Sequence, residues 1–287
     1  MVGGYIALTK PRIIELLLIT TVPTMVLADK GWPSWGLVIV TLVGGTLAAG
    51  GANAINMVVD RDIDRLMERT KTRPLVTGLI TPKGAMIFAL SLEIAAFGVL
   101  WAGANLLSAV LALSATLFYV FIYTLWLKRT SRQNIVIGGA AGAVPVLVGW
   151  AAVQNSLGWE PFLLFMAIFL WTPPHFWALA IRHADDYRAA SVPMLPSVAS
   201  LDETVRHMVG YTVVLAVTTI ALGPVASLGA IYLATAVVAN LVFIVGAVRL
   251  GRAPTSAQSM RLFAYSISYV TLLFVAIAVD VLVEHGV

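Results

Sequence analysis

Residues 50–78 read GGANAINMVVDRDIDRLMERTKTRPLVTG, and this stretch joins an apolar helix directly to a dense group of charges. The first half has the composition of a membrane-spanning helix. The second half holds four carboxylates and then three basic side chains, Asp60, Asp62, Asp64, Glu68, Arg69, Lys71 and Arg73. Because charged groups are costly beside hydrocarbon and usually have a function there, this junction is the first candidate for a site.

The rest of the chain has the composition of a polytopic membrane protein. Of its 287 residues, 60% are hydrophobic and 11% are charged, whereas a soluble domain has about 25% charged residues. Nine apolar runs approach the roughly 20 residues that cross a bilayer as a helix. They cover residues 13–28, 35–57, 84–102, 105–126, 135–153, 161–181, 205–223, 228–248 and 263–283. We therefore expect an all-α fold, a single transmembrane domain over residues 1–287, with nine helices around a central cavity.

The basic residues predict the orientation of these helices. Of the 18 Lys and Arg residues, all but Lys30 fall before the first run or around the connections after runs two, four, six and eight. Since cytoplasmic connections carry the excess of Lys and Arg, we expect the amino terminus in the cytoplasm and the carboxyl terminus outside. The first run shows no cleavable signal pattern and is expected to remain as a span.

Two further features exclude classes of function. The chain has no cysteine, which excludes disulfides, thiolate catalysis and cysteine-based metal sites. The net charge of +4 follows from the cytoplasmic connections of a protein that lies in a lipid bilayer. We therefore expect no nucleic-acid partner.

Asn56, Asp60 and Asp64 follow one another at intervals of four residues. On a helix this spacing places them within an arc of about 80°, and Asn53 falls inside the same arc. One helix face therefore carries amides and two carboxylates where the second run reaches the cytoplasmic interface. The alternative interpretation, solvated charge at a helix end, fits Asp62 better, because Asp62 points to nearly the opposite side.

Carboxylates that converge without thiolates or paired imidazoles suit Mg²⁺, which usually keeps waters and bridges to substrate phosphates. Arg69 and Arg73 follow directly, and guanidinium groups bind phosphate oxygens in a bidentate way. A third basic group, Lys128 and Arg132 in LKRTSRQN (residues 127–134), lies on the same side, one turn apart if the helix continues. Together these residues predict a site for a metal ion and a diphosphate, although topology alone would also explain the basic ones.

A second polar segment follows the sixth run. Residues 171–196 read WTPPHFWALAIRHADDYRAASVPMLP, in which two consecutive prolines are expected to break the helix. Beyond them, His175, Arg182 and Asp186 lie at i, i+7 and i+11, within about 40° of one another on a helix. We expect this stripe and the first acidic face to border one cavity. For His175 alone, a core histidine that binds no ligand is the other interpretation.

The spacing Asn56-x-x-x-Asp60-x-x-x-Asp64 is similar to the first acidic signature of the UbiA superfamily of intramembrane prenyltransferases. Three longer segments resemble the branch of this superfamily that uses haem B, namely TKPRIIELLLIT (9–20), NMVVDRDIDRLMERTKTRPLVTG (56–78) and WTPPHFWALAIRHADDYRAASVPMLP (171–196). The segments TPPHFW and VPMLP distinguish this branch from the rest of the superfamily, because the acidic signature is common to all branches. Many members have a fuller Asp-x-x-x-Asp second motif, whereas this chain has only Asp185 and Asp186, of which the family pattern favours Asp186.

The resemblance implies an enzyme that transfers farnesyl from farnesyl diphosphate to a vinyl group of haem B, with addition of water, to give haem O and diphosphate. It also implies the cytoplasmic or inner membrane of a prokaryote and a downstream haem A synthase as partner. Mg²⁺ would be bound by Asp60, Asp64 and Asp186, with Asn56 in the catalytic group. The diphosphate substrate would contact the amide and basic side chains Asn53, Arg69, Arg73, Lys128 and Arg132. From the stripe geometry, we expect His175 to reach the haem iron and Arg182 to pair with a propionate.

Two alternatives remain open. A sister enzyme of the superfamily would share the acidic signature but prenylate another acceptor, such as 4-hydroxybenzoate or a quinone precursor. A transporter or ion-coupled carrier would also have many spans, broken helices and intramembrane carboxylates. The carrier predicts binding sites near the bilayer midplane, whereas the clusters here lie at one face, and it gives no reason for the four-residue intervals.

Overall fold

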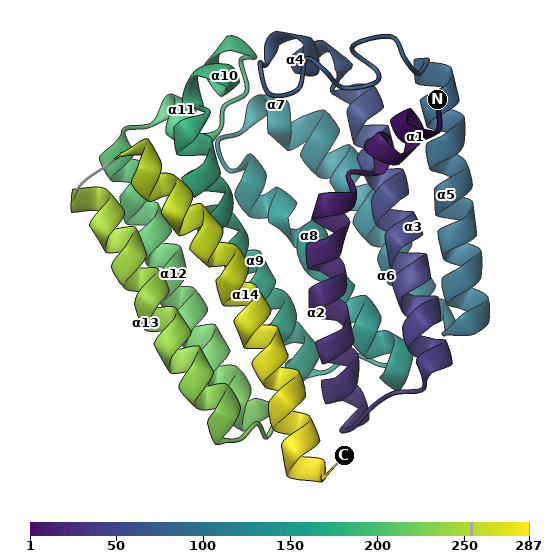
Figure 1. The fold of residues 1–287 in the computed structure, drawn as a ribbon, viewed down its shortest axis with the longest axis vertical. Coiled ribbons are helices and arrows are strands. Elements are labelled where there is room, and N and C mark those ends of the chain that lie inside the picture. Colours follow the sequence, from purple (N-terminus) through teal and green to yellow (C-terminus); the bar gives the residue numbers. More distant parts are fainter. Residues whose placement is uncertain (253–254, 287) are drawn as a thin grey trace.

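The computed structural model describes residues 1–252 and 255–286, and for residues 12, 13 and 15–18 it describes the backbone only. Within these limits every regular element is a helix, which confirms the expected all-α class. Long helices lie side by side, with the two termini at opposite ends of the molecule (Figure 1). Termini at opposite ends are what an odd number of membrane crossings requires.

Eight helices of the described chain are long and apolar enough to cross a membrane. They are α3 (Trp35–Val59), α5 (Pro82–Gly103), the Leu106–Thr130 helix, α8 (Asn134–Gln154), α9 (Trp159–Arg182), α12 (Leu201–Val225), α13 (Ala230–Arg252) and α14 (Ser256–His285). The Leu106–Thr130 helix consists of α6 (Leu106–Leu117), the π-helix η1 (Phe118–Leu127) and α7 (Lys128–Thr130).

The run expected at residues 13–28 corresponds to α2 (Pro11–Asp29). Several side chains in its first half lie outside the described residues, and its described apolar part is the shorter stretch Ile19–Asp29. Each of the other expected runs overlaps one of the eight long helices, with ends that differ by a few residues. The largest difference is at α14, which begins well before residue 263.

The spans close into one bundle. α8 packs against α2, α6 and α9, and α14 packs against both α2 and α9, so the last span reaches the first. α3 packs along α5, and α12 packs against α9 and α13. The largest core cluster lies among α8, α9 and α12 to α14, where Trp177, Phe243 and Phe274 are fully buried. Aliphatic side chains such as Val217 and Leu241 are exposed on the outer faces, as contact with lipid requires.

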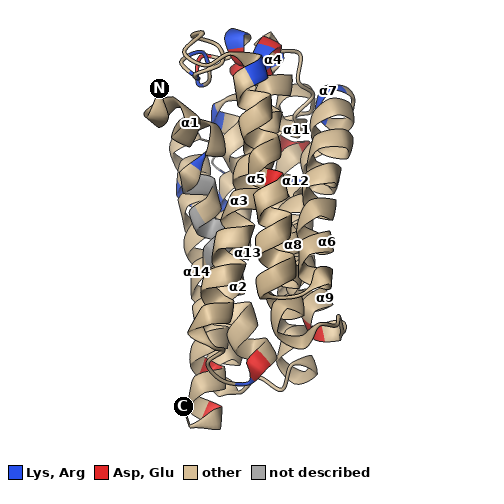
Figure 2. Cartoon of the chain, turned by 90° about the vertical axis from the view of Figure 1, so that its right-hand side faces the viewer, with Lys and Arg blue, Asp and Glu red and all other residues tan. Residues whose placement is uncertain are grey.

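Four short helices lie outside the spans, α1 (Val2–Thr9), α4 (Arg61–Leu66), α10 (Ala184–Ala189) and α11 (Leu195–Val198). They gather at one end of the bundle (Figure 1). Figure 2 shows that most Lys and Arg residues lie at this same end. Because such an excess is typical of the cytoplasmic side, we call it the cytoplasmic end.

The predicted break at the two prolines of the sixth span is wrong. α9 runs from Trp159 to Arg182 and contains Pro173 and Pro174, both buried. Membrane helices tolerate proline where the freed carbonyls face protein. The helix ends only at Arg182, and His183 separates it from α10. The expected single stripe through His175, Arg182 and Asp186 is therefore also wrong, because Asp186 lies on another helix.

A glycine lets α3 approach α5 closely. A Cβ on Gly51 would lie 2.5 Å from Glu93 Oε1 and 3.0 Å from the Ala89 carbonyl oxygen. Glu93 is buried in the bundle, and Thr116 of α6 donates its hydroxyl to Glu93 Oε1 at 3.1 Å. Three helices meet at this carboxyl group. They fix α3, whose cytoplasmic end carries the acidic face.

Candidate active site

Asp60 is the joint between α3 and α4. Its backbone, with φ −84° and ψ 6°, ends α3 at Val59 and begins α4 at Arg61. The Asp60 N–H still donates to the Asn56 carbonyl at 2.9 Å, and the Asp64 N–H donates to the Asp60 carbonyl at 2.8 Å. The helical pattern of hydrogen bonds therefore continues across the joint. It keeps the side chains of Asn56, Asp60 and Asp64 on a common face, and all three are buried.

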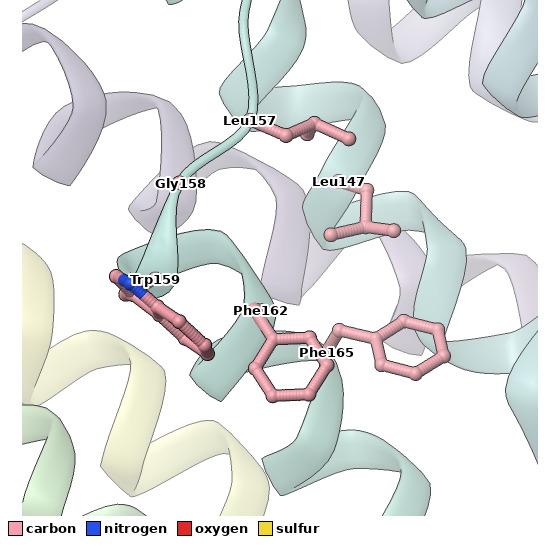
Figure 3. Close-up of a pocket in the computed structure, with 6 residues that line it drawn as sticks. All are labelled: Leu147, Leu157, Gly158, Trp159, Phe162 and Phe165. Atoms are coloured by element: carbon pink, nitrogen blue, oxygen red, sulfur yellow. The ribbon is translucent and has the colours of Figure 1, made fainter.

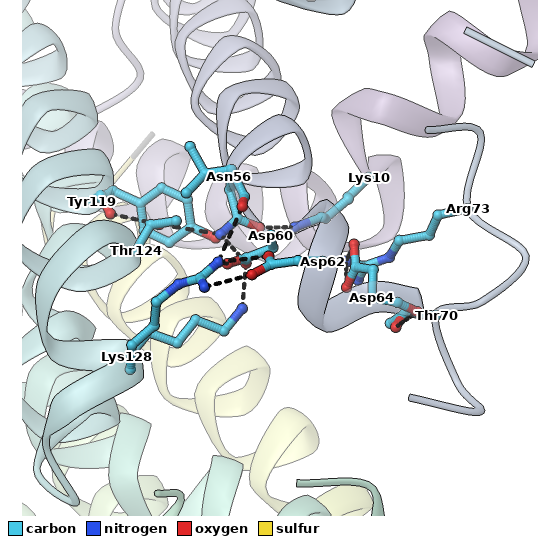
Figure 4. Close-up of polar contacts among 12 residues, drawn as sticks. Lys10, Asn56, Asp60, Asp62, Asp64, Thr70, Arg73, Tyr119, Thr124 and Lys128 are labelled. Carbon is cyan, nitrogen blue, oxygen red and sulfur yellow. Dashed lines mark hydrogen bonds and ion pairs between the residues drawn. The ribbon is translucent and has the colours of Figure 1, made fainter. Parts of the chain in front are cut away.

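Asn56 connects three segments of the chain. Its Nδ2 donates to Asp60 Oδ2 at 2.7 Å and to Thr124 Oγ1 at 3.1 Å, while its Oδ1 accepts from Lys10 Nζ at 2.8 Å. Thr124 lies in η1, and its hydroxyl donates to the Tyr119 carbonyl, five residues earlier, at 2.8 Å. The wide π-helical turn thus presents Thr124 to α3 (Figure 4). Such turns are frequent at functional sites.

Basic side chains neutralise both carboxylates of the acidic face (Figure 4). Lys128 Nζ forms a hydrogen-bonded ion pair with Asp60 Oδ2. Arg73 donates through Nη1 to both oxygens of Asp64, at 2.6 and 2.7 Å. The Thr70 hydroxyl donates to the Asp64 carbonyl at 3.0 Å and so folds the segment after α4 back onto it. Because a buried charge is costly unless it is paired, these contacts hold Lys128 and Arg73 at the site.

Lys10 also belongs to this group, which the sequence did not predict. It occupies the turn between α1 and α2 with a left-handed φ of 53°, and its ammonium reaches Asn56. Asn53, expected to contact substrate, donates instead to the Thr9 carbonyl at 3.0 Å and so fixes this turn. Burial, helped by the neighbouring basic side chains, lowers the pKa of Lys10 to about 7.

Arg129 is a second basic residue that the sequence did not predict. From α7 its guanidinium donates to both oxygens of Asp62, at 2.7 and 2.8 Å, and to the Val59 carbonyl at 3.1 Å. It also lies 3.8 Å from Asp60 Oδ1. The hydrogen bonds from Arg129 lower the pKa of Asp62 to about 2.

Arg132, expected to contact the diphosphate, lies elsewhere. Its guanidinium pairs with Glu203 at the start of α12, at 3.1 Å. The expectation assumed that the helix continues past Lys128, but α7 ends at Thr130 and Ser131 is extended, with ψ 135°. Lys128 and Arg132 therefore do not belong to one continuous helix, and the contact of Arg132 with a diphosphate stays a prediction.

The second acidic segment reaches the same end of the molecule. Asp186 of α10 accepts the Arg69 N–H at 3.4 Å, and His183 Nδ1 lies 4.0 Å from the same carboxylate. A pocket of about 200 Å³ lies between α4 and the loop after α10, lined by Asp62, Ile63, Leu66, Arg129, Ala190, Ser191 and Val192. The structure thus brings the two segments into contact at Arg69 and Asp186.

His175 lies deeper, between α9 and α14. Its side chain is buried, and its ring stacks between Trp171, at 4.2 Å, and Phe263, at 4.6 Å. Its Nδ1 is 2.6 Å from Ser266 Oγ, whereas Nε2 has no hydrogen-bond partner in the described part of the chain. These contacts resemble those of a core histidine. Arg182, by contrast, is exposed where α9 ends.

The donor set at the acidic face is suited to a magnesium ion that is shared with a diphosphate. Among the side chains that the structure describes, which exclude those of residues 12, 13 and 15–18, no three acidic or imidazole groups converge to hold a metal by themselves. Mg²⁺, however, is usually bound through one or two carboxylates together with substrate phosphates. Asp60 Oδ1 is buried without a hydrogen bond, and an unsatisfied buried acceptor is costly. Asp60 Oδ1 is therefore open to such an ion, whereas both oxygens of Asp64 accept from Arg73. The metal-binding roles of Asp60, Asp64 and Asp186 stay predictions.

An apolar pocket of about 610 Å³ lies at the opposite end of the molecule, at the turn between α8 and α9 (Figure 3). Its lining is Leu147, Leu157, Gly158, Trp159, Phe162 and Phe165. No charged side chain belongs to this lining, so it offers nothing to a diphosphate. The charged group at the cytoplasmic end is therefore the candidate active site.

Comparison with known proteins now places the chain. Residues 17–276 match the UbiA prenyltransferase family. The chain belongs to this family. The protoheme IX farnesyltransferase of Frankia casuarinae is 54% identical to this prenyltransferase over 286 residues, 98% of each chain. That of Gloeobacter violaceus is 56% identical over 279 residues, 97% of this chain and 92% of the relative. Within the family, the prenyltransferase falls in the protoheme IX farnesyltransferase branch.

Solved structures confirm the fold of this prenyltransferase. One, from work on digeranylgeranylglyceryl phosphate synthase in membranes, matches with a TM-score of 0.80 at 16% identity and covers 98% of both chains. A UbiA homologue from Archaeoglobus fulgidus bound to GPP and Mg²⁺ matches with a TM-score of 0.67 at 16% identity, over 96% of this chain and 99% of that one. The expected UbiA-like helical fold is therefore correct.

Proposed function

We propose that this prenyltransferase transfers the farnesyl group of farnesyl diphosphate to a vinyl group of haem B. Water then adds to the carbocation formed on the vinyl group and loses a proton to the medium, which gives the hydroxyethylfarnesyl side chain of haem O, with diphosphate as the second product. High identity to protoheme IX farnesyltransferases supports these substrates. The observation that carries the proposed chemistry is the buried group at the acidic face, in which cations from three segments surround two carboxylates, Asp60 and Asp64.

The basic residues of this group account for binding and activation of the diphosphate. Lys128 and Arg73 are held at the acidic face by its carboxylates, and Lys10 is held there by Asn56. Preorganised cations stabilise the charge that develops on the leaving oxygen while the allylic C–O bond breaks. The vinyl carbon of haem then attacks the farnesyl cation. Burial of the site limits the access of water to that cation.

Mg²⁺ is the metal that we propose for this site. Asp60 and Asp64 would hold it, with Asp186 as the third proposed ligand. When bound, the ion supplies positive charge that stabilises the leaving diphosphate. The UbiA homologue bound to GPP and Mg²⁺, which has the same fold, supports this assignment.

The haem side of the reaction is proposed near the cytoplasmic end of α9. Arg182 is exposed there, so its guanidinium can pair with a propionate, and Nε2 of His175 is the atom that would bind the iron. Optical titration with haem B tests both assignments, and we expect weaker binding by His175→Ala and Arg182→Ala. If both variants kept wild-type haem affinity and turnover, the assignments of His175 and Arg182 to the haem would be wrong.

The chain is a multi-pass integral membrane protein. We place it in the cytoplasmic or inner membrane of a prokaryote, with the α4 end toward the cytoplasm. Haem O would then pass to a downstream haem A synthase.

The proposal is tested by reconstitution. Purified protein in lipid vesicles is incubated with haem B, farnesyl diphosphate and Mg²⁺. The haems are then separated by chromatography, and their masses are measured by mass spectrometry. We expect a haem that has gained one farnesyl group and one hydroxyl group, and no product after chelation of the metal. Product only with an added aromatic acid would instead indicate a sister enzyme, and solute flux without any product would indicate a carrier.

A further inference from the structure

Arg129 contacts the joint between α3 and α4, and the proposed chemistry does not use it. It lies next to Lys128 in the chain, so α7 contributes two consecutive cations to this region. Lys128 pairs with the Asp60 carboxylate. Arg129 instead holds the backbone and the outer side of the joint, at the Val59 carbonyl and at Asp62.

The contacts of Arg129 span the joint. Val59 is the last residue of α3, and the carbonyls of a last helical turn have no partner within their own helix. Asp62 belongs to α4, so one guanidinium ties the end of the first helix to the start of the second. The same group lies 3.8 Å from Asp60 Oδ1, the buried oxygen without a hydrogen bond.

The ion pair itself contributes little to the stability of the fold. The side chain of Asp62 is 65% exposed and that of Arg129 is 34% exposed, and ion pairs near water contribute little because solvent screens them. A contact that stabilises little but fixes a functional joint is expected to act on the geometry of the site. Arg129 also borders the pocket that separates α4 from the loop after α10.

We propose that Arg129 is a positioning residue of the diphosphate site. Anchored by Asp62, it sets the angle between α3 and α4 and so fixes Asp60 and Asp64 for the metal and the diphosphate. In this role Arg129 acts through Asp60 and Asp64. This inference rests on the proposed function of the site.

The test compares four variants, Arg129→Gln, Arg129→Lys, Asp62→Ala and the control Arg206→Gln. Arg206 is a fair control because it pairs with Asp202 in an exposed ion pair of the same composition on α12. Binding of non-reactive farnesyl thiodiphosphate with Mg²⁺ is measured by calorimetry in detergent. KM for both substrates and the melting temperature are measured on the same preparations.

Arg129→Gln should weaken binding of the thiodiphosphate about tenfold to a hundredfold, as loss of groups that orient metal ligands does. KM for haem and the melting temperature should stay at the wild-type values. Asp62→Ala should have a smaller effect, because the contacts of Arg129 with Val59 and Asp60 remain. The thiodiphosphate affinity of Arg129→Lys should lie between those of the wild type and Arg129→Gln, because one ammonium cannot reach both the Val59 carbonyl and the Asp62 carboxylate.

Three results would overturn the inference. Thiodiphosphate binding by Arg129→Gln that equals that of Arg206→Gln would do so while leaving the proposed function in place. A fall in melting temperature with equal losses for both substrates would show a merely structural role. If Arg129→Gln does not fold, the test rests on Arg129→Lys and Asp62→Ala. Thiodiphosphate affinity equal to that of the wild type in both variants would then reject the inference. No binding by the wild type would instead reject the proposed function itself.

Discussion

At the scale of single residues, the site is a set of buried charges that hold one another. Asp60 and Asp64 are 0% and 2% exposed, and each is paired with a basic side chain from another segment. Removal of one partner from a buried pair leaves an uncompensated charge. A neutral replacement of either carboxylate therefore disturbs the cation beside it and also removes a proposed metal ligand.

Asp60→Asn and Asp64→Asn should each lower kcat/KM by about a thousandfold, or about 4 kcal/mol of barrier. Product is measured as farnesylated haem in vesicles, and the melting temperature shows whether the variant folds. Asp202→Asn, which changes an exposed carboxylate of α12, is the control and should retain wild-type activity. Near-normal turnover of either site variant would count against the site.

Lys10→Met should raise the Kd for farnesyl thiodiphosphate about tenfold, because it removes a charge-assisted hydrogen bond at the site. Calorimetry with Mg²⁺ present measures this constant. Lys83→Met is the matched control, since Lys83 is exposed at the start of α5, at the same end of the molecule. Equal affinities of the two variants would show that Lys10 does not face the diphosphate.

The affinity for the diphosphate should also depend on pH through Lys10. The pKa of Lys10 is about 7 without substrate, and the anion raises it, because a negative charge favours the ammonium form. At a pH above 7, Lys10 is neutral in the free protein, so binding of the diphosphate must add a proton to Lys10 and the affinity falls as the pH rises. At a pH below 7, Lys10 is already charged and does not change the affinity with pH. Titrations across this range should show the fall in the wild type and a weaker one in Lys10→Met. Parallel curves for the two proteins would contradict the assignment.

The sequence revealed those site residues whose relation is local. The four-residue interval of Asn56, Asp60 and Asp64 is visible along a single helix, and the structure keeps it. Lys10 meets Asn56 across 46 residues of sequence and Arg129 meets Asp62 across 67, and nothing in one chain marks such pairs. The only signal for Lys10 was its place before Pro11 in the segment TKPR.

At the scale of elements, hydropathy predicted the spans well because burial in lipid depends directly on composition. It could not predict how the helices bend. The joint at Asp60, the π-helix η1 and the end of α7 at Thr130 depend on contacts between helices, and they decide which side chains face the site. The helix break predicted at Pro173 and Pro174 was wrong for the same reason, because packing in the bundle keeps α9 helical through both prolines.

The contact of α3 with α5 gives a prediction at this scale. Gly51→Ala should destabilise the protein by about 1–3 kcal/mol, a usual cost of overpacking, because its Cβ would meet Glu93 and the Ala89 carbonyl. Gly45→Ala is the control on the same helix, with no atom within 4 Å of the added Cβ. Thermal unfolding in detergent should therefore show a lower melting temperature for Gly51→Ala and an unchanged one for Gly45→Ala. Equal melting curves for the two variants would show that α3 can move away from α5 without cost.

At the scale of the whole molecule, the two ends of the bundle have different chemistry. The end with α4 and α10 gathers most of the basic residues together with the buried carboxylates Asp60 and Asp64 (Figure 2), whereas the opposite end carries the apolar pocket beside Trp159. A diphosphate is soluble in the aqueous phase and its farnesyl tail is not. A charged site at one membrane face, above apolar helices, suits a substrate with both properties.

This asymmetry predicts which end faces the cytoplasm, and the chain lends itself to the test because it has no cysteine. Single variants Ser156→Cys, in the turn between α8 and α9, and Ala257→Cys, at the start of α14, place one thiol at each end on exposed residues. A maleimide that cannot cross the membrane should label Ser156→Cys in intact cells and Ala257→Cys only in inverted vesicles. The cysteine-free parent controls for background. The reverse pattern would put the acidic face on the outer side, and it would show that the excess of Lys and Arg does not predict the orientation of this chain.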